Sequence, residues 1–142
     1  MRVLVTGSRG FIGKNLVVRL EEQSDTEIFH FSRGNSVNNL EEIVKNCDYV
    51  VHLAGENRPK DIADFAVVNS DLTNSLCEAI RNTSRNIPLI LASSTQASMD
   101  NPYGESKLSA ESVVKKFSKD TGNDVIIYRL PGVFGKWCKP NY

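Results

Sequence analysis

Five short apolar runs, each separated from the next by a stretch long enough for a helix, limit the fold of this chain more than any other feature of its sequence. Such runs, rich in β-branched and aromatic residues, are typical of β-strands. They span residues 2–6, 27–31, 49–54, 88–93 and 124–130. Because the runs are apolar almost throughout, we expect a parallel sheet with helices on both faces. The sequence therefore predicts one doubly wound parallel α/β domain of about five strands.

The stretches between the runs are suited to helices, but one of them is short. Apolar residues recur at helical spacing, for example at Leu16 and Leu20 and at Leu76 and Ile80. Residues 32–48 leave room for one short helix only, so the edge strand that a complete Rossmann half carries there should be missing or vestigial. The chain ends in VFGKWCKPNY, which we interpret as the entry to further structure. We therefore expect a single domain that is a fragment of a longer protein.

The charge balance and the cysteines argue against several classes of function. Lys and Arg together number 17, as do Asp and Glu, with no run of like charge, so we expect neither nucleic acid nor a membrane as a partner. Cys47, Cys77 and Cys138 form no CxxC pair and only two histidines accompany them, so we expect free thiols and no metal site. Without a signal peptide or an apolar stretch of membrane-spanning length, the sequence predicts a cytoplasmic protein.

Three glycines, Gly7, Gly10 and Gly13, lie between the first predicted strand and its helix in the segment VTGSRGFIGKNL. Glycine permits a sharp turn, lets a pyrophosphate approach the backbone, and lets the helix pack close to the strand. The N–H groups at the start of that helix, around Phe11 and Ile12, add partial positive charge for the anion. The GK[ST] ending of a nucleoside-triphosphate loop is absent. The pattern therefore predicts a dinucleotide site.

The residues after the second predicted strand indicate which dinucleotide is bound. NAD-binding folds commonly carry a carboxylate there for the ribose hydroxyls, whereas this chain has Ser32 and Arg33. Arg9, in the glycine loop, should lie on the same side. Either arginine alone would be read as a solvated surface residue, but two of them can meet a ribose 2′-phosphate with charge-assisted hydrogen bonds. We therefore predict an NADP-binding domain, with NADPH as its cofactor.

A tyrosine and a lysine stand four residues apart in DNPYGESKLSAE, at the start of a predicted helix. Asn101 can cap this helix and Pro102 fits its first position, so Tyr103 and Lys107 share one helical face. Because a phenol is a weak acid at neutral pH, a neighbouring cation must stabilise its anion before it can exchange protons efficiently. Lys107 can supply that charge. The alternative is that Lys107 is a solvated partner of Glu111.

A hydroxyl at the end of the fourth strand, in LILASSTQAS, should complete this site. Ligands of open α/β sheets bind at the carboxyl ends of the strands, where a hydroxyl can polarise a substrate carbonyl. Ser94 is the residue that we prefer, and Ser93 and Thr95 stay open as alternatives. Because side chains alternate along a strand, either Ser94 or this pair of neighbours should point away from the site.

The order of these motifs, a glycine loop, then HLAG, then a serine, then YGESK, resembles that of the extended short-chain dehydrogenases/reductases. The resemblance implies that Ser94, Tyr103 and Lys107 form a catalytic triad. It also implies that Tyr103 and Lys107 contact the cofactor, with Lys107 binding the nicotinamide ribose.

The same resemblance implies two further stretches of cofactor contact. One is the backbone of Leu53, Ala54 and Gly55 in HLAG. The other is the segment RLPGVFG, where Val133 is the expected contact and Gly132 replaces an asparagine that is frequent in the family.

Longer strings, HLAGENRP, QASMDNPYGESK and FGKWCKPNY, resemble the CapF group of capsular-polysaccharide enzymes. That resemblance implies NADPH-dependent reduction of the 4-keto group of a UDP-linked 6-deoxy-hexosamine, during formation of UDP-N-acetyl-L-fucosamine. A sugar-binding subdomain and a metal-binding cupin domain complete those enzymes, and these 142 residues contain neither, so the chain alone could be inactive. Two alternatives stay open, an NAD-dependent nucleotide-sugar epimerase or dehydratase and a non-catalytic NADPH-binding module. Related enzymes often dimerise, which makes a homodimer a candidate assembly, although nothing in the sequence fixes its interface.

Overall fold

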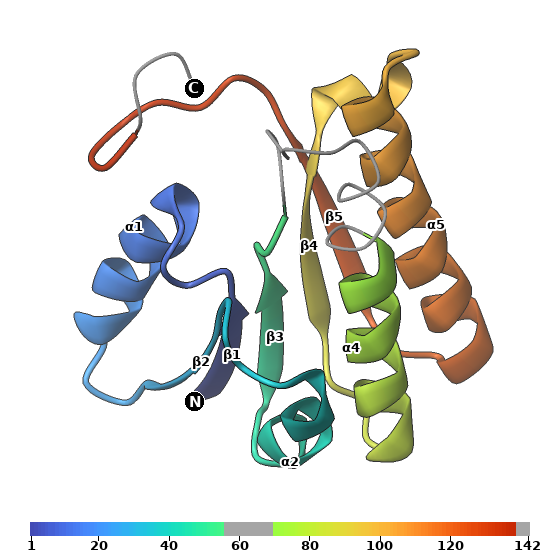
Figure 1. Ribbon diagram of the computed structural model, residues 1–142. Helices are drawn as coiled ribbons and strands as arrows, with labels where there is room; N and C mark the ends of the chain where they lie inside the picture. The colour runs from blue at the N-terminus through green and yellow to red at the C-terminus, as the bar shows by residue number, and fades with distance from the viewer. Residues whose placement is uncertain (56–69, 139–142) are drawn as a thin grey trace.

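A single parallel sheet forms the centre of the computed structural model, which describes residues 1–55 and 70–138 (Figure 1). Its strands follow the order β2-β1-β3-β4-β5, and every neighbouring pair is parallel. They are β1 (Arg2–Thr6), β2 (Glu27–Phe31), β3 (Tyr49–His52), β4 (Leu89–Ser94) and β5 (Val125–Leu130). The predicted doubly wound α/β fold is therefore confirmed.

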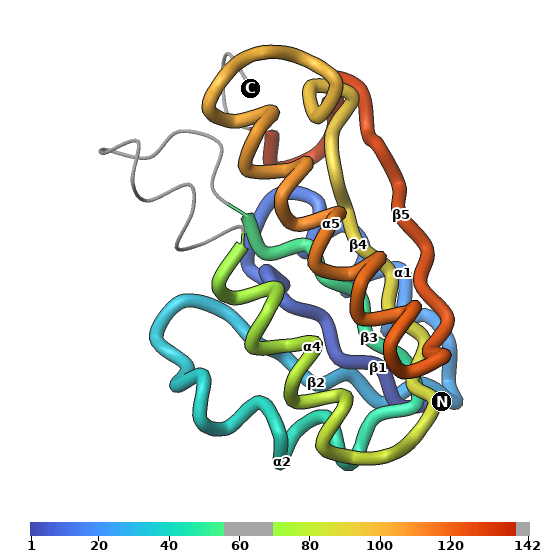
Figure 2. The backbone as a smooth tube through the Cα atoms, turned by 90° about the vertical axis from the view of Figure 1, so that its right-hand side faces the viewer, coloured from blue at the N-terminus to red at the C-terminus, as the bar shows by residue number. Residues whose placement is uncertain are grey.

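Helices cover the sheet on both faces (Figure 2). In the described part of the chain they are α1 (Phe11–Glu21), α2 (Leu40–Lys45), α4 (Leu72–Asn82) and α5 (Pro102–Thr121), with short 3₁₀ turns η1 (Val37–Asn39) and η3 (Thr95–Ser98). α1 packs on β1 and β2 on one face, while α2, α4 and α5 lie side by side on the other. Because α1 does not reach β5, Ile126 and Tyr128 of that strand stay largely exposed.

The hydrophobic core lies between the sheet and the layer of α2, α4 and α5. Leu4, Val50 and Leu89 point into it from three neighbouring strands and are fully buried. Ile80 of α4 and Phe117 of α5 pack against them from the helix layer. Each such side chain stabilises the fold by about 1.5–3 kcal/mol through removal of its apolar surface from water. This packing fixes the carboxyl ends of the strands relative to α5.

The interval between β2 and β3 contains η1 and α2 and no strand, and every residue from 32 to 48 is described. The expectation of a missing edge strand is therefore confirmed, and β2 is the edge of the sheet on that side. The third strand is shorter than predicted, since β3 ends at His52 rather than at residue 54. The reason is that the Ala54 N–H leaves the ladder and donates to the side chain of Thr6.

All five strands run in the same direction, so their carboxyl ends meet at one edge of the sheet, at the top in Figure 1. The glycine loop, residues 53–55, the end of β4 and the start of α5 all lie at this edge. Residues 131–138 leave β5 there and cross the edge to α1, where the Asn15 side-chain amide donates to the Lys136 carbonyl at 2.9 Å. Parts of the strings HLAGENRP and FGKWCKPNY lie outside the described residues.

Candidate active site

The glycine loop approaches the backbone of residues 53–55 so closely that no side chain fits between them. Gly7 has a φ of +68°, in the left-handed region that favours glycine. A Cβ on Gly7 would lie 2.7 Å from the Ala54 nitrogen, and one on Gly13 would lie 2.2 Å from the Gly7 carbonyl oxygen. The HLAG segment therefore crosses directly beside the loop, and α1 starts close against it.

Hydrogen bonds hold the loop against the end of β2 and leave the start of α1 suited to an anion. The Gly7 N–H donates to the Phe31 carbonyl at 2.7 Å, and the Gly10 N–H donates to the Gly7 carbonyl at 2.9 Å. No described side chain caps α1, and no acidic residue lies in its first turn. The Ser8 Oγ is buried in this loop and has no hydrogen-bond partner among the described residues. These features fit a bound pyrophosphate.

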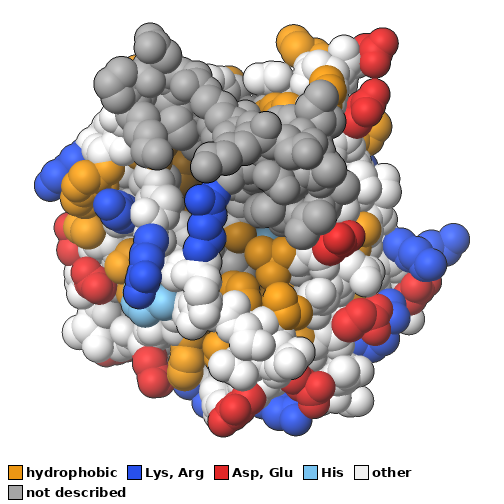
Figure 3. Space-filling view, viewed as in Figure 1, with side chains coloured by type: hydrophobic (Ala, Val, Ile, Leu, Met, Phe, Trp, Pro, Cys, Tyr) orange, Lys and Arg blue, Asp and Glu red, His pale blue; other side chains and the backbone are white. Residues whose placement is uncertain are grey.

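Arg9 and Arg33 lie on two segments that the Gly7–Phe31 hydrogen bond brings together. Both arginines are exposed. Ser32 begins a turn after β2, in which its N–H donates to the Asn35 side chain at 2.8 Å. The turn, residues 32–36, contains no carboxylate. Figure 3, which has the same viewpoint as Figure 1, shows Lys and Arg side chains gathered on the left of the molecule, over α1 and the neighbouring strand ends.

A buried histidine ties the HLAG segment to its neighbours. The His52 Nδ1 lies 2.6 Å from the Thr6 hydroxyl, and its Nε2 lies 2.9 Å from the Thr73 hydroxyl on α4. The Thr6 hydroxyl also accepts the Ala54 N–H at 3.1 Å. Burial, together with the positive charge of Lys107, lowers the pKa of His52 to about 3, so the imidazole is neutral. The chain of bonds fixes Ala54 beside Gly7.

Replacing His52 with Gln should make the folded protein less sensitive to acid. The pKa of this group is about 3 in the folded protein and about 6.5 in an unfolded chain. The unfolded state therefore binds more protons between these values, and stability falls as the pH falls through this window. Between pH 7 and pH 5 this group costs the wild type about 2 kcal/mol of unfolding free energy. Urea unfolding at both pH values measures the loss.

The His52→Gln variant should be less stable than the wild type at pH 7, because it loses part of the Thr6–His52–Thr73 chain. It should nevertheless lose about 2 kcal/mol less than the wild type on going to pH 5. An equal loss in both proteins would show that His52 is not the group that titrates.

The start of α5 is fixed by its cap and by a close contact with η3. The Asn101 side chain accepts the Gly104 N–H at 2.8 Å, and Pro102 occupies the first turn, as the sequence predicts. A Cβ on Gly104 would lie 2.2 Å from the Gln96 carbonyl oxygen, so this turn of the helix presses on the backbone that follows β4. Tyr103, between the cap and this contact, is therefore held at the carboxyl edge of the sheet.

Lys107 lies beneath the tyrosine, almost out of contact with solvent. Its Nζ is 5.9 Å from the centre of the Tyr103 ring and donates to the Ala92 carbonyl at 3.1 Å. Only 7% of Lys107 is exposed, and this burial lowers its pKa to about 8. The alternative of a solvated pair with Glu111 is wrong, because Glu111 binds Arg129 and Lys115 instead.

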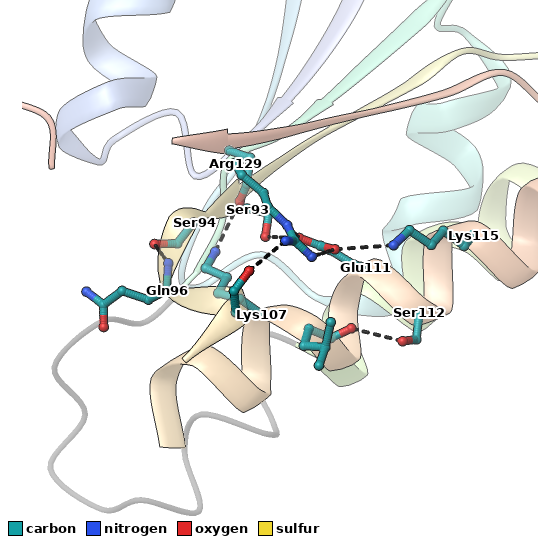
Figure 4. A network of polar contacts seen from close by, with 11 residues as sticks. Ser93, Ser94, Gln96, Lys107, Glu111, Ser112, Lys115 and Arg129 are labelled. Atoms are coloured by element: carbon teal, nitrogen blue, oxygen red, sulfur yellow. Dashed lines mark hydrogen bonds and ion pairs between the residues drawn. The ribbon is translucent and has the colours of Figure 1, made fainter. Parts of the chain in front are cut away.

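The hydroxyls at the end of β4 differ sharply in their surroundings (Figure 4). Ser93 is buried and donates to a Glu111 carboxylate oxygen at 2.7 Å. Ser94 is partly exposed, and its hydroxyl accepts the Gln96 N–H at 3.1 Å. Thr95 is exposed at the start of η3. Ser93 is thus engaged in the protein interior, which leaves Ser94 and Thr95 as the hydroxyls that can meet a ligand.

The residues after β5 pack less closely at the candidate site than the residues of the glycine loop do. Val133 is partly buried, and a Cβ on Gly132 would meet no described residue within 4 Å. A Cβ on Gly135 would be 3.8 Å from the Phe11 ring, at the start of α1. The structure therefore brings this segment to the glycine loop, while none of the described residues lies close to where a Gly132 side chain would be.

The pair of Glu111 and Arg129 beside the site was not predicted from the sequence, which offered Glu111 only as a possible partner of Lys107. Glu111 is 1% exposed and makes two hydrogen bonds with the Arg129 guanidinium, at 2.7 and 2.8 Å. A signal was present, since Glu111 follows Lys107 by four residues and so lies on the same helical face. Arg129 interrupts the apolar run of β5, and it is the buried carboxylate of Glu111 that needs a partner of opposite charge.

The described residues, 1–55 and 70–138, contain no group of three or more His, Cys, Asp or Glu side chains placed to hold a metal ion. Within the same ranges, no helix has the length and apolar character needed to cross a membrane. The three cysteines form no disulfide.

Comparison with known proteins places this site in a family. The model of the NAD dependent epimerase/dehydratase family matches residues 3–142. A UDP-2-acetamido-2,6-beta-L-arabino-hexul-4-ose reductase from Pseudomonas aeruginosa is 49% identical over 142 residues, which cover all of this chain and 38% of that protein. The crystal structure of the capsular polysaccharide assembling protein CapF from Staphylococcus aureus superimposes with a TM-score of 0.85 and 41% sequence identity. The match covers all of this chain and 38% of that one.

The same fold occurs in more distant structures. A UDP-glucuronic acid 4-epimerase from Bacillus cereus, solved in complex with NAD, has a TM-score of 0.88 at 22% identity, over all of this chain and 60% of that one. The chain spans about two fifths of the length of its reductase and CapF relatives. The family match covers the glycine loop, the HLAG segment and the Tyr103–Lys107 pair. The chain therefore belongs to the NAD dependent epimerase/dehydratase family, whose members bind a nicotinamide dinucleotide.

Proposed function

We propose that this chain is the cofactor-binding and catalytic part of an NADPH-dependent reductase. Its substrate is a UDP-linked 4-keto-6-deoxy-hexosamine, whose C4 carbonyl is reduced to an alcohol in the synthesis of a surface-polysaccharide precursor. The observation that carries the proposal is the buried Lys107 beside Tyr103, at the sheet edge where the glycine loop lies. The similarity to a UDP-sugar 4-keto reductase supports the choice of substrate.

The residues at the carboxyl edge of the sheet have different roles in the proposed reaction. The backbone at Gly7, Gly10 and Gly13 and the start of α1 hold the pyrophosphate, and residues 53–55 border the sugar next to it. When bound, NADPH supplies the hydride for C4 of the sugar. The protein's own task is to hold the carbonyl oxygen and to deliver a proton to it.

Tyr103 delivers that proton, and two neighbours prepare it for the transfer. The Lys107 ammonium, poorly solvated and 5.9 Å from the ring centre, stabilises the phenolate that forms when the proton leaves. Ser94 donates a hydrogen bond to the carbonyl oxygen and so stabilises the charge that develops on it. Val133 contributes to the wall near the nicotinamide.

The preference for NADPH over NADH rests on the two arginines at the end of β2 and in the glycine loop. Arg9 and Arg33 provide positive charge where a ribose 2′-phosphate would lie, and Ser32 provides a hydroxyl. Because residues 32–36 include no carboxylate, nothing in this turn repels the phosphate. A homodimer and a cytoplasmic location stay predictions.

Cofactor consumption tests the proposal against the alternative of an epimerase or dehydratase. The protein expressed from its complete reading frame is mixed with the UDP-linked 4-keto sugar and NADPH, and absorbance at the nicotinamide band is followed. We expect one NADPH to be oxidised for each alcohol formed. Conversion of the sugar with no net change in absorbance would identify an enzyme that recycles its cofactor, and no conversion at all would favour a non-catalytic binding module.

A further inference from the structure

A buried carboxylate beneath the candidate active site connects four structural elements (Figure 4). Glu111 of α5 accepts hydrogen bonds from the Ser93 hydroxyl of β4 and from the Arg129 guanidinium of β5, and Lys115 lies 3.4 Å away at the surface. A further Arg129 nitrogen donates to the Ser98 hydroxyl of η3 at 2.8 Å. The network thus joins β4, η3, α5 and β5 around the end of β4.

The carboxylate of Glu111 is charged at every pH at which the protein is expected to work. Hydrogen bonding by Arg129, with help from Ser93 and Lys115, lowers its pKa to about 2 even though burial acts in the opposite direction. A buried charge of this kind is stable only while its partner stays in place. The Glu111–Arg129 pair therefore holds α5 and β5 at a fixed separation.

The network also holds Ser93, the residue that precedes Ser94 at the end of β4. Ser93 is bound to Glu111, and because side chains alternate along a strand, its neighbour Ser94 faces the opposite side. Ala92, on the other side of Ser93, accepts the Lys107 ammonium. Three successive residues of β4 are thus each held by a defined contact, and η3, against which Gly104 packs, is held through Ser98.

We propose that Glu111 and Arg129 are positioning residues of the reductase site, which fix Ser94 and Lys107 in the arrangement that proton transfer to the substrate requires. Neither residue touches the reacting atoms. The Glu111–Arg129 pair acts through Ser93 and Ser98, and the proposal rests on the reductase function proposed above. A displacement of about 1 Å in such a site can slow a reaction by about 10²-fold.

The test compares Glu111→Gln with the wild type in the protein expressed from its complete reading frame. Glutamine is close in size and can still accept from Ser93, but it no longer pairs with the Arg129 charge. We expect kcat for reduction of the UDP-linked 4-keto sugar to fall by about 10- to 100-fold. The KM for the sugar and the Kd for NADPH, measured by fluorescence titration, should change by less than about threefold, because the glycine loop is untouched.

An isotope effect separates loss of position from loss of folded protein. With NADPH that carries deuterium at the transferred position, a variant whose chemical step is slowed should show a larger isotope effect on kcat than the wild type. A variant that is merely partly unfolded would have fewer active molecules and an unchanged isotope effect. Lys115→Met is the matched control, since Lys115 is exposed and contacts the same carboxylate from outside, and it should leave kcat and the isotope effect unchanged.

Arg129→Lys provides a second test in case Glu111→Gln folds poorly. Lysine keeps the positive charge but cannot bind Glu111 with two nitrogens and Ser98 with a third, so kcat should again fall while the isotope effect rises. If the wild type is active but both variants keep its kcat or its isotope effect, the positioning role is overturned and the reductase function is not. A wild type that binds NADPH but does not oxidise it with the sugar would overturn the reductase function and this role together.

Discussion

Tyr103→Phe is expected to lower kcat for reduction by about 10²- to 10⁴-fold, the usual contribution of a positioned general acid. Phenylalanine fills the same space but has no proton to give to the carbonyl oxygen. Because cofactor contacts are spread over the glycine loop and residues 53–55, the Kd for NADPH should rise by no more than about threefold. Steady-state absorbance measurements and a fluorescence titration with NADPH provide the two values.

Tyr49→Phe is the matched control for this substitution. Tyr49 is exposed at the start of β3, at the opposite edge of the sheet from the site. Its replacement by Phe removes a phenolic hydroxyl, as Tyr103→Phe does. Its kcat should equal that of the wild type. If Tyr103→Phe retained full activity, the tyrosine would have no part in the proton transfer, and the proposed division of roles would have to be abandoned.

Arg33→Asp is expected to reverse the cofactor preference. The change removes a cation that we place beside the 2′-phosphate and puts a carboxylate there, which repels a phosphate but can accept hydrogen bonds from ribose hydroxyls. Loss of one charge-assisted hydrogen bond alone should weaken NADPH binding by about 10- to 100-fold. NADH should bind as well as before or better. Fluorescence titrations with both cofactors measure the ratio of the two Kd values.

Arg19→Asp is a suitable control for charge. Arg19 is an exposed residue of α1 that pairs with Glu22. Its replacement by Asp changes the net charge by the same amount, but away from the loop after β2. The ratio of the Kd values should stay at the wild-type level. Equal NADPH affinity in Arg33→Asp and the wild type would show that Arg33 does not meet the 2′-phosphate.

Local sequence signals were sufficient for the fold because each describes a single element. The alternation of apolar strands with helical spacing predicts β1 to β5 to within two residues at each end. Residues 32–48 are too few for a further strand, and the structure has none there. Asn101 and Pro102 predict the start of α5 because a helix cap depends on neighbouring residues only.

Contacts between distant segments could not be predicted in the same way. The early end of β3 depends on Thr6, which lies 48 residues from the Ala54 N–H that it accepts. The choice between Ser93 and Ser94 depends on Glu111, which is 18 residues further along the chain. Strand alternation indicates that the two serines face opposite sides, but only the position of α5 shows which side holds the carboxylate. These tertiary contacts define the surroundings of the candidate site.

Transfer of an isotope from cofactor to sugar tests the central claim most directly. The protein from its complete reading frame is incubated with the UDP-linked 4-keto-6-deoxy-hexosamine and with NADPH deuterated at the transferred position of the nicotinamide. The account predicts one deuterium at C4 of each alcohol product, with one NADPH oxidised, by NMR and mass spectrometry. A product without deuterium at C4, or a sugar converted while the NADPH stays intact, would contradict it.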